Sequence, residues 1–113
     1  MSPRLGAVLE ELEGVINARK AAESERSYTA RLLAGGVPKI AGKVTEEAGE
    51  LVQAAAAETD DRVVAEAADL LYHVLVLLAA RDLSLRQVEE TLAGRFGVSG
   101  LDEKASRQTS EPS

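Results

Sequence analysis

The stretch VTEEAGELVQAAAAETDDRVVAEAADLLYHVLVLLAA, residues 44–80, carries the strongest indication of the fold class. Apolar side chains recur at helical spacing on both sides of a short polar break, the segment TDD at 59–61. We expect one helix that opens at Pro38 and ends near Glu58, and a second helix over about 61–81. Because the break is so short, the two helices form an antiparallel hairpin. The stretch therefore predicts an all-α fold with a central helix hairpin.

Two further helices are predicted before the hairpin. An apolar stripe at helical spacing indicates a first helix over about 3–22. A short helix over 28–34 follows, capped by Ser27 and stopped by the two glycines at 35–36. No strand is predicted anywhere in the chain. The fold class is therefore all-α, with four to five helices.

A last helix is predicted after the hairpin. SLRQ at 84–87 is a capping box, in which serine and glutamine side chains satisfy backbone N–H groups at a helix start. The apolar stripe then continues to Gly97. We expect residues 1–100 to form one domain and 101–113 to form a partly flexible tail, whose basic part reaches toward the functional site.

The composition excludes several classes of partner. The chain has 113 residues, with 13 Lys and Arg against 19 Asp and Glu, so its formal net charge is −6. Nucleic acid and anionic membranes would meet general repulsion, and we expect neither as a partner. Cysteine is absent, which excludes disulfides and thiolate metal sites. The longest nearly apolar run is far shorter than the ~20 residues of a membrane span, so we expect a cytoplasmic protein.

The hairpin carries acidic residues on both helices. The first helix has three glutamates within five positions, and the second has two carboxylates and a histidine on an otherwise apolar circumference. These residues are Glu46, Glu47, Glu50, Glu66, Asp69 and His73. Folding about the TDD turn puts Glu50 level with Asp69 and Glu47 near His73, with Glu66 about one turn away. Carboxylates that converge in this way suit Mg²⁺ or Mn²⁺, which prefer hard oxygen ligands.

Other interpretations of these residues stay open at this point. The carboxylates could line a solvated face, with Arg62 and Glu66 as a simple ion pair four residues apart. A di-iron bundle would need Glu-x-x-His on two helices, whereas the single histidine is preceded by Leu70 three residues earlier. His73 could be a ligand, a partner of a ligand or a buried imidazole bonded to Asp69, and we favour a structural role or that of a partner of a ligand.

The same motifs resemble a known enzyme family. EExxE followed by ExxD, here at 46–50 and 66–69, is the pattern of the all-α NTP pyrophosphatase superfamily. SYTARLLAGGVPKIAGKVTEEAGE (27–50), EAADLLYHVLVLL (66–78) and EKASR (103–107) resemble more specifically the phosphoribosyl-ATP pyrophosphatases of histidine biosynthesis. The resemblance covers roughly residues 5–107.

The resemblance implies hydrolysis of phosphoribosyl-ATP between its α and β phosphates to phosphoribosyl-AMP and pyrophosphate. It implies Mg²⁺ as the cofactor, with Mn²⁺ as a substitute. Carried over by motif, the metal ligands are Glu47, Glu50, Glu66 and Asp69. Glu46 lies beside them as a further ligand or as the residue that orients water, so the expected catalytic residues are Glu46, Glu47 and Glu50.

Several residues are candidate substrate contacts, each with a plainer alternative. The cations could bind phosphate or simply be solvated, and Ser27 and Tyr28 could line the nucleotide site or serve as a cap and as packing. The candidates are Ser27, Tyr28, Lys39, Lys43, His73, Lys104 and Arg107. The competing functions are a housekeeping pyrophosphatase for non-standard nucleotides and a non-enzymatic helical dimerisation module. The SYTARLL and EKASR segments argue against the first.

The predicted helix over 61–81 also bears on assembly. It is apolar over more than half its circumference, more than its thin neighbours in this chain would readily cover. A second subunit is the simplest cover. The resemblance likewise implies a dimer with sites near the subunit interface, and we expect a homodimer.

Overall fold

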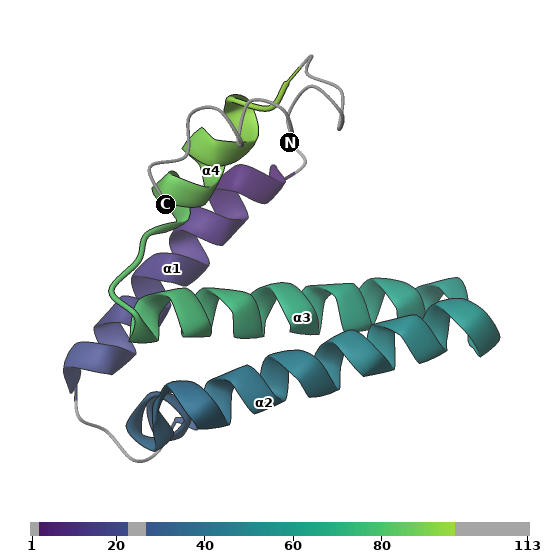
Figure 1. The fold of residues 1–113 in the computed structure, drawn as a ribbon, viewed down its shortest axis with the longest axis horizontal. Coiled ribbons are helices and arrows are strands. Elements are labelled where there is room, and N and C mark those ends of the chain that lie inside the picture. Colours follow the sequence, from purple (N-terminus) through teal and green to yellow (C-terminus); the bar gives the residue numbers. More distant parts are fainter. Residues whose placement is uncertain (1–2, 23–26, 97–113) are drawn as a thin grey trace, which may run out of the picture.

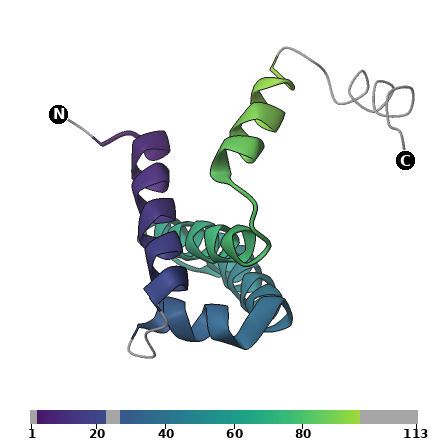
Figure 2. The ribbon, with the colours of Figure 1, turned by 90° about the vertical axis from the view of Figure 1, so that its left-hand side faces the viewer.

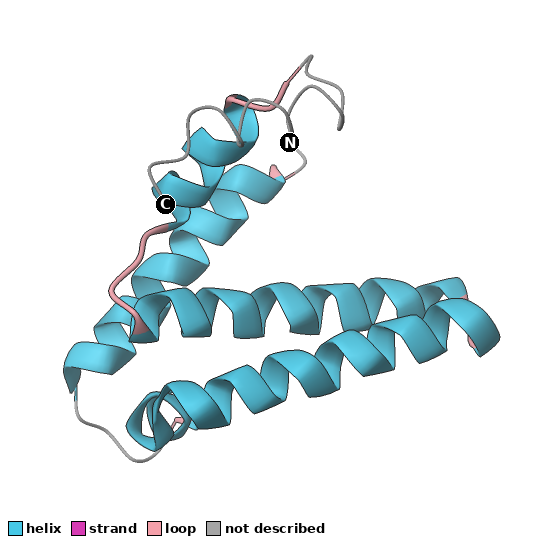
Figure 3. Ribbon diagram, viewed as in Figure 1, coloured by secondary structure: helices cyan, strands magenta, loops and turns pink. Residues whose placement is uncertain are grey.

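The computed structural model describes residues 3–22 and 27–96, and this part of the chain folds into α-helices without a strand (Figures 1 and 3). The helices are α1 (Leu5–Ala22), α2 (Tyr28–Ala57), α3 (Asp60–Ala80) and α4 (Leu85–Ala93). The predicted all-α class is confirmed. The first helix begins two residues later than predicted, at Leu5.

The long helix α2 consists of two segments that meet at Gly36. The backbone there has φ 85° and ψ 173°, a conformation essentially restricted to glycine. Pro38 lies in the first turn of the second segment, where its missing N–H needs no helical partner. Ser27 caps the first segment by accepting a hydrogen bond from the Ala30 N–H. The predicted short helix and its glycine stop are therefore present within α2.

Helices α2 and α3 form the antiparallel hairpin that the sequence predicts, and they run side by side in Figure 1. The turn between them consists of Glu58 and Thr59 alone. Thr59 caps α3, because its hydroxyl accepts a hydrogen bond from the Arg62 N–H. The predicted turn at 59–61 is thus too late in the chain, since Asp60 already belongs to α3.

The apolar core lies at one end of the hairpin, where α1 crosses it (Figures 1 and 2). The buried members of this core come from all four helices. They are Ile16, Leu32, Ile40, Leu75, Val76, Ala79 and Leu85. Lys20 fastens the end of α1 by donating to the Ala79 carbonyl at 2.7 Å and by pairing with Asp82 in the turn after α3.

Helix α4 begins with the predicted capping box. The Ser84 hydroxyl accepts from the Gln87 N–H, and the Gln87 side chain accepts from the Ser84 N–H at 2.8 Å. The Leu85 N–H donates to Glu13 at 2.7 Å, which ties α4 to α1. The helix ends at Ala93 and gives way to a turn, so the predicted end at Gly97 is wrong.

The outer half of the hairpin extends beyond α1 and α4 (Figure 1). Val52 and Val64 there are 68% and 69% exposed. Among the described residues, α3 is long and apolar enough to cross a membrane by length and composition, and 28% of its most apolar window is buried. An apolar helix of a water-soluble protein passes the same test, and Glu66 and Asp69 within α3 are costly in a bilayer.

Candidate metal centre

Five carboxylates from α2 and α3 converge in two overlapping groups. Oxygens of Glu46, Glu47 and Glu50 lie within 4.8 Å of one another, one from each residue. Oxygens of Glu47, Glu66 and Asp69 satisfy the same limit. Glu47 therefore belongs to both groups and joins the two helices at the centre.

The hairpin brings these residues together in a different register from the predicted one. Glu66 was expected about one turn away, whereas it lies in one group with Glu47 and Asp69. The difference follows from the turn: because α3 starts at Asp60, its residues pair with α2 residues earlier in the chain than a turn at 59–61 implies.

Two of these carboxylates are buried without full hydrogen bonding. Glu47 and Glu66 are 7% and 4% exposed, whereas Glu46, Glu50 and Asp69 are exposed. The Oε2 atoms of Glu47 and Glu66 are inaccessible to solvent and have no hydrogen-bond partner within residues 3–22 and 27–96. A buried carboxylate oxygen without a partner is costly unless a cation coordinates it. These atoms fit a hard divalent ion that takes oxygen ligands.

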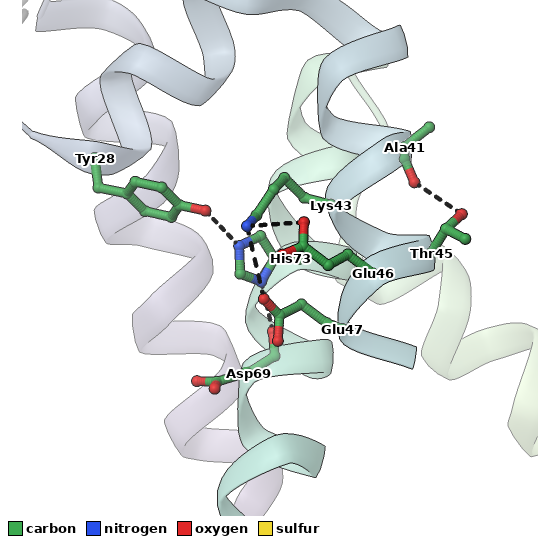
Figure 4. A network of polar contacts seen from close by, with 8 residues as sticks. All are labelled: Tyr28, Ala41, Lys43, Thr45, Glu46, Glu47, Asp69 and His73. Atoms are coloured by element: carbon green, nitrogen blue, oxygen red, sulfur yellow. Dashed lines mark hydrogen bonds and ion pairs between the residues drawn. The ribbon is translucent and has the colours of Figure 1, made fainter. Parts of the chain in front are cut away.

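Two cations compensate part of the negative charge. Lys43 lies 3.3 Å from Glu46 Oε2 and 3.8 Å from Glu47 Oε1 (Figure 4). Arg62 pairs with Glu66 Oε1 and lies 3.6 Å from Glu58. The ion pair between Arg62 and Glu66 that the sequence suggests is present, but it leaves the other oxygen of Glu66 unpaired.

The electrostatics follow this arrangement. Burial raises the pKa of the Glu66 carboxyl above its ordinary value, and the hydrogen bond and negative charge of Glu50 raise it further, against the opposing effect of Arg62. The hydrogen bond to Glu46 raises the pKa of Lys43. A buried carboxyl with a raised pKa, such as that of Glu66, is expected where a bound cation normally supplies positive charge.

A group of aromatic and polar side chains adjoins the carboxylates. The Tyr28 hydroxyl and His73 Nε2 are 2.8 Å apart, and His73 Nδ1 lies 2.7 Å from the Asp69 carbonyl oxygen (Figure 4). Tyr72 stacks on Tyr28, with ring centroids 6.2 Å apart, and its hydroxyl bonds to Thr29. His73 thus bonds the Asp69 backbone and fixes α3 against the start of α2.

The other candidate substrate contacts do not lie together in the structure. Ser27 acts as the cap of α2. Lys39 is exposed and makes no ion pair with the carboxylates among the described residues. Lys104 and Arg107, like the predicted tail, lie outside the described residues.

Sequence reasoning missed two features near the centre. The contact between Tyr28 and His73 joins residues 45 positions apart, so no local pattern shows it. Tyr72 was not singled out, although its position next to His73 was a usable signal.

Chemically, the centre is a set of oxygen donors with exposed and buried members on one stripe of each helix. Such a set can bind divalent cations and leave coordination positions for water and phosphate oxygens.

A comparison with known families decides what kind of protein carries this centre. The family profile described as "Phosphoribosyl-ATP pyrophosphohydrolase" matches residues 9–96, a span that contains all five carboxylates. The chain belongs to the phosphoribosyl-ATP pyrophosphohydrolase family.

Individual members of the family are similar over nearly their whole length. A protein of Erythrobacter litoralis is 54% identical over 99 residues, which are 88% of this chain and 95% of the relative. One of Trichlorobacter lovleyi is 54% identical over 101 residues, 89% and 94% of the two chains. One of Pelobacter propionicus is 50% identical over 102 residues, 90% and 94%. Each of these relatives is named phosphoribosyl-ATP pyrophosphatase.

Proposed function

We propose that this chain hydrolyses phosphoribosyl-ATP to phosphoribosyl-AMP and pyrophosphate, a step of histidine biosynthesis. The observation that carries the proposal is the family match over residues 9–96, which includes every carboxylate of the centre. Relatives that share about half of their residues with this chain carry the name of that activity. A cytoplasmic location fits an enzyme that acts on a nucleotide.

We assign the metal-binding role to Glu47, Glu50, Glu66 and Asp69. The unpartnered buried oxygens of Glu47 and Glu66 support this assignment. Mg²⁺, or Mn²⁺ in its place, would supply charge neutralisation of the triphosphate and polarisation of the bond that is cleaved.

The neighbouring side chains would orient the substrate and the attacking water. Glu46 is exposed and has Lys43 beside it, so its carboxylate can accept a hydrogen bond from water. Lys43 lies between Glu46 and Glu47 and can donate to a phosphate oxygen without leaving its helix turn. Tyr28 and His73 hold the start of α2 against α3 beside the centre.

The proposal is tested by turnover of phosphoribosyl-ATP with Mg²⁺, without it, and with a chelator. We expect phosphoribosyl-AMP and pyrophosphate only when a divalent cation is present. Glu50→Gln and Asp69→Asn should lose turnover by at least about a hundredfold, because each removes a charged ligand. Glu90→Gln on α4 is the matched control: it removes an exposed carboxylate paired with Arg86 and should keep activity.

The competing functions predict different results in the same assay. A housekeeping pyrophosphatase would cleave deoxynucleoside triphosphates in preference to phosphoribosyl-ATP. A non-enzymatic dimerisation module would show no turnover, and Glu50→Gln would leave its properties intact or stabilise it by relieving repulsion. Either result would reject the proposed activity.

We also propose that two copies of the chain associate as a homodimer through the outer face of the hairpin. Val64 and Leu71 are seven residues apart in α3, on the side opposite Glu66 and His73, and they are 69% and 40% exposed. Ala68 between them is exposed as well. A contiguous apolar face of this kind is typical of a helix that packs against another subunit.

A further inference from the structure

A second charged feature lies at the other end of α2, at a hollow of about 950 Å³. The hollow is formed where the end of α1 meets the first segment of α2 and the end of α3, a junction visible in Figure 2. Its volume is within the range of small-molecule sites, about 300–1,000 Å³. Among the described residues that line it, four are basic and none is acidic, in a chain whose net charge is −6: the four are Arg19, Lys20, Arg31 and Lys39.

Among the described residues, only one of these four cations, Lys20, has partners. Lys20 pairs with Asp82 and donates to the Ala79 carbonyl. The side chains of Arg19, Arg31 and Lys39 make no ion pair or hydrogen bond within the described parts of the chain, 3–22 and 27–96. Unpaired cations gathered around one hollow repel each other, and an anion bound between them would relieve that repulsion.

The backbone is shaped to hold Lys39 in this place. A Cβ atom added to Gly35 would lie 2.4 Å from Lys39 Cδ, so the aliphatic stem of Lys39 runs directly over Gly35. Any side chain at position 35 would force Lys39 to take another path. The glycine pair that breaks α2 thus also makes room for one of the cations.

The hollow and the carboxylate centre are connected along α2. Lys39 and Glu47 lie on the same side of α2, eight residues apart. At 1.5 Å per residue, this is a separation of about 12 Å along the helix axis. The proposed substrate, as its name states, carries the triphosphate of ATP and, on an added phosphoribosyl group, a phosphate monoester. If the carboxylate centre takes the triphosphate, the second phosphate lies a nucleoside length away.

We propose that the hollow binds the phosphate monoester of the substrate's phosphoribosyl group, through Arg19, Arg31 and Lys39. This inference rests on the proposed function and names the residues that would select phosphoribosyl-ATP over other nucleoside triphosphates. Arginine presents a planar fork of N–H donors that matches a phosphate, and two arginines with one lysine more than balance the charge of a dianion. ATP and other nucleoside triphosphates lack this group, so the hollow would favour phosphoribosyl-ATP over them.

The test compares discrimination between two substrates. We expect Arg31→Gln and Lys39→Gln each to lower the ratio of kcat/KM for phosphoribosyl-ATP to kcat/KM for ATP by about 10- to 100-fold, as for a lost hydrogen bond between charged groups. The loss should lie mainly in KM for phosphoribosyl-ATP. Arg86→Gln, which removes one positive charge on α4, is the matched control and should leave the ratio unchanged.

A binding measurement separates this inference from the proposed activity. Calorimetric titration with ribose 5-phosphate should show binding to the wild type and to Glu50→Gln, and binding weakened at least about tenfold in Arg31→Gln. If the wild type hydrolyses phosphoribosyl-ATP, and Arg31→Gln and Lys39→Gln both keep the wild-type preference for it over ATP, the inference is wrong and the proposed activity stands. If ribose 5-phosphate binding depends on Arg31 but the protein does not hydrolyse phosphoribosyl-ATP, the hollow is a phosphate site and the proposed activity is wrong.

Inorganic phosphate is the second source of the same chemistry. If it binds as tightly as ribose 5-phosphate, and the two variants keep their substrate discrimination, the hollow is a site for free phosphate and the inference is wrong. Gly35→Ala gives an independent check, because it displaces Lys39 while all charges stay. It should raise KM for phosphoribosyl-ATP and leave kcat close to that of the wild type.

Discussion

Glu47 is the residue on which the carboxylate centre depends most. It belongs to both groups of converging oxygens, it is 7% exposed, and its Oε2 has no hydrogen-bond partner in the part of the chain that the structure describes. Glu46, its neighbour in sequence, belongs to one group and is exposed. The same residue type in adjacent positions therefore has two different environments, because successive helical residues point about 100° apart.

This difference predicts unequal effects of the same substitution. Glu47→Gln should abolish Mg²⁺ binding in a calorimetric titration, whereas Glu46→Gln should weaken it. Wild-type protein at 100 times its Kd for Mg²⁺ should gain about 2.7 kcal/mol of unfolding free energy, and Glu47→Gln should gain almost none. Thermal unfolding with and without Mg²⁺ checks this. Equal Mg²⁺ affinity of the two variants would contradict the central position of Glu47.

The raised pKa of Glu66 predicts a pH dependence of stability in the absence of metal. Since the folded-state pKa lies above the unfolded value, the folded protein binds this proton more readily. The corresponding stability is fully present below the unfolded pKa of about 4.3 and is lost as pH rises through the folded pKa. Glu66→Gln lacks this titration.

We therefore expect the Tm of Glu66→Gln, measured with a chelator, to rise relative to that of the wild type as pH increases from about 4 to 7. The comparison uses the same buffer series for both proteins. A Tm difference that is constant over this range would show that Glu66 titrates alike in the folded and unfolded chain.

At the scale of helices, the break in α2 is the feature with the sharpest backbone requirement. Gly36 has φ 85° and ψ 173°, which other residues adopt only with strain. Gly42, six residues later, is in regular helix, and an added Cβ would meet nothing within 4 Å. The backbone conformation therefore requires glycine at position 36, whereas position 42 has room for a side chain.

Alanine at each position should have opposite effects on stability. Gly36→Ala should lower the free energy of unfolding by about 1–3 kcal/mol, because alanine is strained in that conformation. Gly42→Ala should raise it by about 0.5–1 kcal/mol, since alanine loses less backbone entropy in a helix. Urea unfolding of both variants gives the comparison. A stable Gly36→Ala protein would mean that α2 can straighten through the break.

The helices show what the sequence can and cannot predict. The capping box at Ser84 and Gln87, the cap at Ser27 and the glycine break were predicted correctly, because each is encoded within a few neighbouring residues. The register of the hairpin was not. A shift of one or two residues at the Glu58–Thr59 turn brings Glu66, expected about one turn away, beside Glu47. Periodicity alone does not fix the exact residues of the turn. An error of one or two residues there changes which side chains of the two helices meet.

At the scale of the whole molecule, the fold divides into a covered and an uncovered half. The buried apolar core gathers at the end of the hairpin that α1 crosses, with Leu32, Val76 and Leu85 among its members. The carboxylate centre lies in the hairpin beyond this core, where α3 presents exposed Val64 and Leu71 on its outer side. The proposed homodimer would cover that side and would stiffen the helix that supplies Glu66 and Asp69.

A single charge on this face should therefore act on assembly first. Val64 is 69% exposed, so Val64→Lys removes little packing within one subunit and should leave the isolated fold intact. In a dimer joined through α3 the same lysine would be desolvated next to its symmetry mate, which costs several kcal/mol. We expect sedimentation analysis to show a dimer for the wild type and a monomer for Val64→Lys. Val15→Lys on α1, with a 46% exposed valine, is the matched control and should remain dimeric. If Val64→Lys sediments as a dimer while keeping its helical circular dichroism, the subunits associate through another surface.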